Sequence, residues 1–177
     1  EEQCLLNRLS VFVGGCSLES AELVAGFDPI EDYEVLDHLV SLVDKSLVVY
    51  DSEVQRYRLL ETMRQYGREK LQLAGESETV QNRHADYFFG QATEARAGLQ
   101  GRDPKAWMDR IDPDLDNFRS AIKHFHGADA GKEAGMLVSM WRYFDSPLLR
   151  IVSRYGMRGA WRSKSILYRR FRRSEMI

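Results

Sequence analysis

Residues 127–132 contain the glycines and the lysine of a phosphate-binding loop, and their spacing decides whether they can act as one. Such a loop needs four residues between its glycines, so that backbone amides surround the phosphates, and Ser or Thr after the lysine to hold magnesium. Here three residues separate Gly127 from Gly131, and Glu133 follows Lys132. We therefore interpret this segment as a loop between two helices.

Three aspartates at alternate positions, Asp112, Asp114 and Asp116, resemble the start of a calcium-binding loop. That loop also requires Gly at its sixth position and a bidentate Glu at its twelfth. The chain has Asn117 and Lys123 at those positions. The carboxylates are better explained as residues in the first turn of a helix, where they interact favourably with the positive end of the helix dipole.

The four histidines do not follow a metal-binding pattern. His124 and His126 are two residues apart, which on a helix directs their side chains to different faces. His38 and His84 stand alone in the sequence. The sequence also lacks a Ser–His–Asp nucleophile signature, a Cys-x-x-Cys pair and a Gly-x-Gly-x-x-Gly turn. We therefore predict no catalytic residue, no metal site, no cofactor and no enzyme within this chain.

The elements that position these residues begin with a predicted winged helix-turn-helix domain at residues 1–75. Apolar spacing predicts helices at 3–13, 17–25 and 32–43, strands at 46–50 and 54–60, and a helix at 61–73. Ser17 is expected to cap the second helix, and Gly75 is expected to end the last. A packed helix, a β-hairpin wing and a closing helix in this order form a winged helix.

The rest of the chain predicts more helices, so the fold class is mainly α. Helices are expected at 76–98, from Trp107, after Asp112 and from Ala134, with Asp112 as an N-cap and Pro113 at the first helical position. Antiparallel helices with short loops favour a tetratricopeptide-like helical-repeat region at residues 76–145. Residues 146–177 are assigned as a basic tail, because residues 150–177 carry nine Lys and Arg and one acidic residue.

Charge argues against specific DNA binding by the winged helix, which would require a basic face. Residues 1–75 carry 7 Lys and Arg against 14 Asp and Glu. The helix in the recognition position contains several acidic residues, with only Lys45 opposing them; these are Asp32, Glu34, Asp37 and Asp44. On the wing, Arg56 and Arg58 are too few to reverse this balance.

Composition is that of an ordinary globular chain. The sequence is 44% hydrophobic and 29% charged. Its length of 177 residues is enough to bury a core without metal or disulfides. Cys4 and Cys16 are expected to be buried, reduced thiols. No apolar run approaches the length of a membrane span, and the N-terminus shows no export signal, so we expect a cytoplasmic protein with no membrane partner.

Several short sequence segments, taken together and in this order along the chain, resemble the bacterial STAND-class regulators, which are large predicted ATPases of the LuxR and AfsR type. These segments are LSVFVGG at 9–15, LVSLVDKSL at 39–47, YRLLETMRQYG at 57–67, GE at 75–76, RHADY at 83–87 and DNFRSA at 116–121. The similarity runs from about Leu5 to Tyr143. It stops at Phe144, where a shifted reading frame and a diverged terminus would both fit the sequence.

The resemblance implies that this chain is a non-catalytic regulatory and protein-interaction fragment of a transcription regulator. A nucleotide-binding ATPase core, holding ATP or ADP, is then expected before Glu1, with the winged helix packed against it and an unknown effector or protein on the helical repeats. In related proteins a Met-His-Asp motif at the last helix of the winged helix senses ADP. Here it aligns with Leu59-Leu60-Glu61, so Arg58 and Glu61 are candidate residues for sensing the nucleotide state. Two alternatives are that Glu61 is only a helix N-terminal residue, and that the chain is a DNA-binding winged-helix module.

Overall fold

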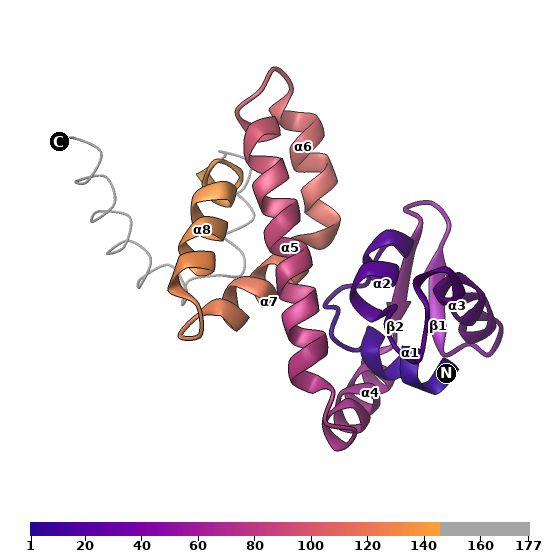
Figure 1. Cartoon of the computed structure of the whole chain (residues 1–177). Helices are drawn as coiled ribbons and strands as arrows, with labels where there is room; N and C mark the ends of the chain where they lie inside the picture. The colour runs from indigo at the N-terminus through magenta and orange to yellow at the C-terminus, as the bar shows by residue number, and fades with distance from the viewer. Residues whose placement is uncertain (146–177) are drawn as a thin grey trace. The chain divides into compact units, whose positions relative to one another are not determined.

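The computed structural model describes residues 1–145 (Figure 1). Contacts divide the chain into two compact units, Glu1–Met140 and Trp141–Ile177. The predicted basic tail at 146–177 lies outside the described residues. The division of the remainder at residue 75 stays a prediction, because both predicted parts contribute to the first unit. All interactions described below lie within that unit.

The first six elements form the winged helix. They are α1 (Glu2–Leu9), α2 (Leu18–Ala25), α3 (Val35–Asp44), β1 (Val48–Asp51), β2 (Arg56–Leu59) and α4 (Glu61–Leu73). The predicted mainly helical fold, with a winged helix and a small hairpin, is confirmed. Helix α3 begins three residues later than expected, because Asp32–Glu34 form a 3₁₀ turn. That turn is fixed by a capping box between Glu31 and Glu34.

The hairpin strands pair antiparallel, with Val48 opposite Leu59 and Asp51 opposite Arg56. The loop after α1 extends this small sheet, because Cys16 and Tyr57 exchange two backbone hydrogen bonds of 2.9 Å. This pairing fixes the loop containing Gly14 and Gly15 beside strand β2. Strand β2 therefore has a backbone partner on each side at Tyr57, β1 on one and the loop after α1 on the other.

The core of the winged helix comes from the apolar side of each helix, as periodicity predicts. Its fully or almost fully buried residues include Leu5, Leu9, Val24, Leu39 and Leu42. Ser17 caps α2 as predicted, since its hydroxyl accepts a hydrogen bond from the Ser20 amide. Burying such side chains contributes about 1.5–3 kcal/mol each before the entropy cost of ordering the chain.

Four helices follow the winged helix: α5 (Ser77–Leu99), α6 (Pro104–Ile111), α7 (Leu115–Phe125) and α8 (Ala130–Asp145). Gly75 separates α4 from α5 as predicted, with the positive φ of +74° that ends many helices. The predicted N-cap at Asp112 is wrong. Asp112–Asp114 form a 3₁₀ turn directly after α6, and α7 begins at Leu115.

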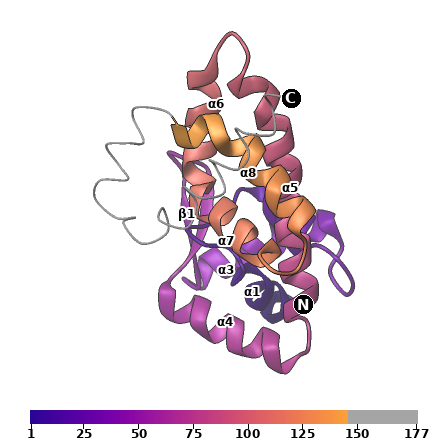
Figure 2. The same cartoon turned by 90° about the vertical axis from the view of Figure 1, so that its left-hand side faces the viewer.

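Helix α5 is the long support of this helical part. It packs against α7 and α6, and it also contacts α2 of the winged helix. Both views place α4 near one end of α5 and α6 near the other (Figures 1 and 2). Phe88 of α5 packs edge-on against Phe118 of α7 at 5.2 Å between ring centroids. The tetratricopeptide-like character of these helices stays a prediction.

No helix within residues 1–145 is both long enough and apolar enough to cross a membrane.

Candidate functional site at the wing and its junction with the helical part

The two candidate sensing residues, Arg58 and Glu61, line one surface hollow of about 540 Å³. Arg58 comes from strand β2, and Glu61 is the first residue of α4. The other side of the hollow is the loop at Gly14 and Gly15, and its floor is largely apolar. Sequence reasoning therefore selected two residues that the fold does bring to the same place.

The charged residues that line this hollow each have an ion-pair partner. Glu61 binds Arg64 through two oxygens, with Nη2–Oε1 at 2.6 Å and Nε–Oε2 at 2.9 Å. The Arg58 guanidinium lies 3.6 Å from the Asp51 carboxylate and is about half exposed. Guanidinium groups bind phosphates and carboxylates in the same forked geometry. An anionic group entering the hollow would therefore compete with Asp51 for Arg58 and with Glu61 for Arg64.

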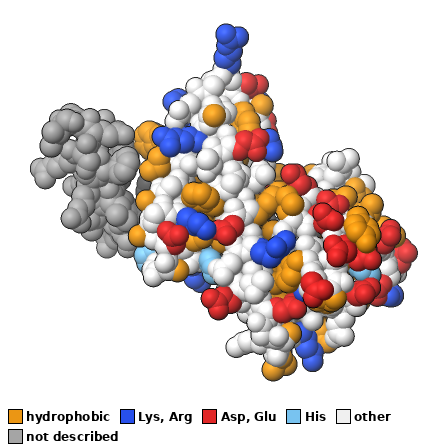
Figure 3. All heavy atoms as spheres, in the orientation of Figure 1, with side chains coloured by type: hydrophobic (Ala, Val, Ile, Leu, Met, Phe, Trp, Pro, Cys, Tyr) orange, Lys and Arg blue, Asp and Glu red, His pale blue; other side chains and the backbone are white. Residues whose placement is uncertain are grey.

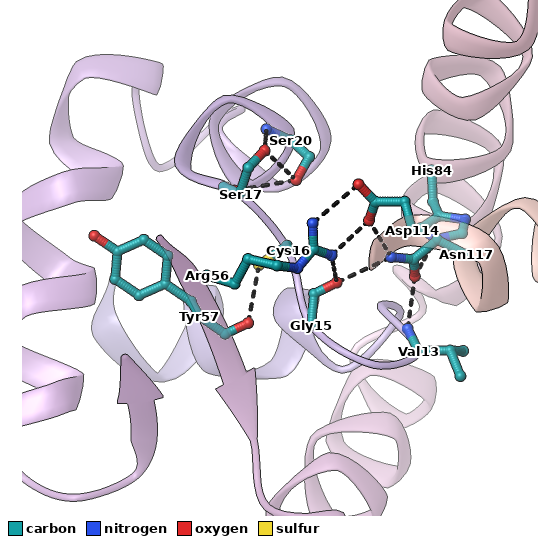
Figure 4. Close-up of polar contacts among 10 residues, drawn as sticks. All are labelled: Val13, Gly15, Cys16, Ser17, Ser20, Arg56, Tyr57, His84, Asp114 and Asn117. Carbon is teal, nitrogen blue, oxygen red and sulfur yellow. Dashed lines mark hydrogen bonds and ion pairs between the residues drawn. The ribbon is translucent and has the colours of Figure 1, made fainter. Parts of the chain in front are cut away.

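The neighbouring arginine on the wing, Arg56, is buried. Its Nη1 donates to Asp114 Oδ2 at 3.0 Å, and its Nη2 donates to Asp114 Oδ1 at 2.6 Å and to the Gly15 carbonyl at 3.0 Å (Figure 4). Burial alone would lower the pKa of Arg56, but the hydrogen bond and charge of Asp114 raise it. This buried pair joins the wing to the turn that precedes α7.

Asn117, on the first turn of α7, completes the same contact. Its amide nitrogen donates to the Gly15 carbonyl at 2.9 Å and to Asp114 Oδ1 at 2.8 Å. Its oxygen accepts a 2.7 Å hydrogen bond from the Val13 amide. One side chain thus satisfies two backbone groups of the loop after α1. We call Arg56, Asp114, Asn117 and the Gly15 carbonyl the junction cluster.

His84 of α5 lies at the inner side of the junction cluster and is 2% exposed. Its Nε2 is 3.3 Å from Asn117 Oδ1, and its ring packs against Phe12 and Phe88. Because that oxygen can only accept, the contact requires the tautomer with the proton on Nε2. Burial lowers the pKa of His84 to about 4.

A second buried arginine joins the winged helix to the start of α5. Arg8 of α1 is fully buried and binds both Glu76 oxygens, at 2.9 and 3.0 Å. It also donates to the carbonyls of Ala25, Phe27 and Asp28 after α2, and its guanidinium lies 3.5 Å from the centroid of the Phe27 ring. Two buried arginines of the winged helix thus bind carboxylates outside it, Arg8 at Glu76 and Arg56 at Asp114.

The motifs that resemble binding loops have structural roles. Asp129, before Lys132, caps α8 by accepting the Lys132 amide at 2.9 Å. Asp114 binds Arg56, whereas Asp116 pairs with Arg119 on the surface. Within the described residues, no three His, Cys, Asp or Glu side chains gather where they could hold a metal ion.

The two cysteines are free, as expected, although Cys4 is only half-buried. Burial raises the pKa of Cys16 to about 12. Its thiol is therefore protonated near neutral pH, and a protonated thiol is a poor nucleophile. Cys16 borders the hollow at Arg58 without giving it a reactive group.

Sequence reasoning missed the junction cluster. Arg56 was read as an exposed charge of the wing, and Asp114 as a first-turn residue of α7. The pair is 58 residues apart in sequence, so no local pattern could reveal it. The sequence gives only an indirect indication of this contact: Asn117 and Gly15 both lie in segments that carry the family resemblance.

Comparison with known families agrees with the fold of the first part of the chain. Residues 1–72 match the family described as "Winged helix-turn-helix domain". No solved structure matches the chain significantly.

Mycobacterial proteins are similar to the chain over a longer stretch. A Mycobacterium tuberculosis protein named "Putative HTH-type transcriptional regulator" is 38% identical over 146 residues, and a Mycobacterium bovis protein of that name is equally similar. An uncharacterized M. tuberculosis protein is 40% identical over 103 residues, covering 56% of this chain and 26% of its own length. The match to the two regulators covers 79% of this chain but only 16% of their length.

Removing the carboxylate of Asp114 leaves the buried Arg56 charge without its partner. We expect Asp114→Ala to lower the free energy of unfolding by about 3 kcal/mol, the scale for breaking one side of a buried pair. Asp116→Ala, which removes an exposed pair two residues away, is expected to change it by less than about 0.5 kcal/mol. Urea denaturation of both variants checks this, and equal losses would show that the junction pair is no stronger than a surface pair.

The lowered pKa of His84 predicts a pH dependence of stability. The imidazole titrates near pH 6.5 in the unfolded chain and near pH 4 in the folded protein. Between these values the unfolded chain binds the extra proton, so stability falls as the pH falls, by up to about 1.4 kcal/mol per pH unit. Urea denaturation from pH 7 to pH 4.5 should give a shallower dependence of stability on pH for His84→Gln than for the unmodified protein. An unchanged slope in His84→Gln would contradict this.

Proposed function

We propose that this chain is a non-catalytic regulatory part of a transcription regulator, and that it acts by interacting with protein. The observation that carries the proposal is the junction cluster. Arg56, one of two arginines on the wing, is buried against Asp114 and the Gly15 carbonyl and is not available to a nucleic acid. A wing anchored in this way would transmit the position of α7 to the winged helix. Such a coupling between the helical part and the winged helix is what a regulatory domain requires.

The surface of α3 supports this choice over direct DNA recognition. Asp37 and Asp44 are exposed there together with Leu36 and Val40. In the space-filling view, acidic side chains gather around apolar ones over the winged helix (Figure 3). Phosphate contacts supply most of the affinity of a DNA-binding helix, and this face would repel them.

The wider setting that we propose is a STAND-type ATPase of the LuxR and AfsR type. The sequence resemblance supports it, and the regulators' much greater length leaves room for an ATPase core that binds ATP or ADP. Arg58 and Glu61 would then sense the nucleotide state of that core, because both line the same surface hollow. A protein of this kind would work in the cytoplasm, with an effector or partner protein on the helical part.

The second candidate is a sequence-specific DNA-binding module. The domain family matched by residues 1–72 and the name of the mycobacterial relatives favour it. It would require base contacts from α3 despite the acidic side chains on that helix.

A sequence-selection assay on the full chain decides between these candidates. We expect no enriched DNA motif, because the α3 face is acidic, and only weak binding that salt abolishes, through the basic residues after residue 149. Enrichment of a motif, lost on Leu36→Ser and retained in the Lys105→Ser control on α6, would establish the DNA-binding function instead.

The sensing role is tested by nucleotide binding. The chain alone is expected to show no saturable binding of a labelled adenine nucleotide at micromolar concentrations, because it has no phosphate-surrounding loop. With the ATPase core present in the full-length protein, Arg58→Ala or Glu61→Ala should change the preference between ADP and ATP. Arg119→Ala, which removes the Asp116 ion pair on α7 far from Arg58 in the sequence, is the control. No change in that preference would remove the sensing role.

A further inference from the structure

The recognition-position helix α3 is apolar on its solvent side as well as on its core side. Val35, Leu39 and Leu42 are fully buried, as a core-facing stripe should be. On the outside, however, Leu36 is 40% exposed and Val40 is 50% exposed. A helix face that meets only water is normally polar.

Tyr33, in the 3₁₀ turn before α3, extends this apolar strip and is 73% exposed. Positions 33, 36 and 40 follow the three- and four-residue spacing of one helix face. They span roughly 10 Å along the helix, about two turns. That length suits the side chains of one short helix or loop of another protein.

The charges beside the strip are of one sign. Asp37 and Asp44 lie on the same side of α3 by helical spacing, and Asp32 precedes Tyr33; all three are exposed. Lys45 is the only Lys or Arg between residues 31 and 47, and it pairs with Glu2 of α1. A partner that buries the apolar strip must therefore bring positive charge to its edge.

We infer that the face formed by Tyr33, Leu36 and Val40, with Asp37 and Asp44 at its edge, is a docking surface for a basic, apolar protein segment. The charge complementarity selects this occupant. A second copy of the face would bring like charges together, and a DNA duplex would bring phosphates to the aspartates. The inference deepens the proposed function and rests on it, because it names the chemistry of the protein that the winged helix contacts.

Two labelled synthetic peptides test this surface on the full chain. One is an amphipathic helical peptide of Leu and Lys, and the other has Glu in place of each Lys. Fluorescence anisotropy should show saturable binding of the Leu/Lys peptide only. The double variant Leu36→Ser, Val40→Ser should weaken that binding about tenfold, the scale of losing two apolar contacts.

Charge reversal separates docking from general attraction to an acidic chain. The double variant Asp37→Lys, Asp44→Lys should weaken binding of the Leu/Lys peptide and allow binding of the Leu/Glu peptide. The matched control Glu78→Lys, Asp109→Lys makes the same charge change at exposed positions of α5 and α6 and should leave both affinities within about twofold. All substituted positions are exposed, and thermal unfolding confirms that each variant is folded.

The possible outcomes separate the inference from the proposed function. No binding of the Leu/Lys peptide, or equal weakening by the α3 and control variants, overturns the docking surface and leaves the regulatory role in place. Sequence-specific DNA binding that the α3 variants abolish overturns both. Binding of the Leu/Glu peptide to the unmodified chain also overturns the inference, because it contradicts the charge complementarity.

Discussion

The buried guanidinium of Arg56 is the constraint around which the winged helix and the helical part are arranged. A charge removed from water is stable only where acceptors surround it, and three of those acceptors come from outside the hairpin. The turn before α7 must therefore place the Asp114 carboxylate beside Arg56, and the loop after α1 must direct the Gly15 carbonyl toward the same guanidinium. Asn117 fills the remaining space and binds the loop on its other side.

The same interaction bears on the function of the winged helix. In this chain one of the two wing arginines, Arg56, is buried against Asp114 of the helical part. The remaining wing arginine, Arg58, faces the hollow that also contains Glu61. Meanwhile α3 exposes aspartates and apolar side chains. These surfaces favour contacts with protein, which is why we propose a regulatory role and not direct DNA recognition.

The sequence was sufficient to predict which elements form, because periodicity, caps and turn residues are local. The bounds were less accurate, since the helix predicted at 3–13 ends at Leu9 and the helix predicted from Ala134 begins at Ala130. Helix α4 was predicted with its observed bounds, and Gly75 ends it as expected. The start of α7 was misplaced, because Asp114 is used in a tertiary contact and the Asp-Pro turn tightens into a 3₁₀ turn. The junction cluster could not be predicted, because Arg56 and Asp114 are 58 residues apart in the sequence and meet only through the packing of the helices.

A double-mutant cycle between Arg56 and Asp114 tests most directly whether this contact joins the two parts. The free energy of unfolding is measured for Arg56→Met, Asp114→Ala and the variant with both changes. We predict a coupling energy of at least about 2 kcal/mol, with the double variant no less stable than Asp114→Ala, because removing both charges leaves neither one unpaired. Additive losses, with a coupling energy near zero, would contradict the central role of the junction.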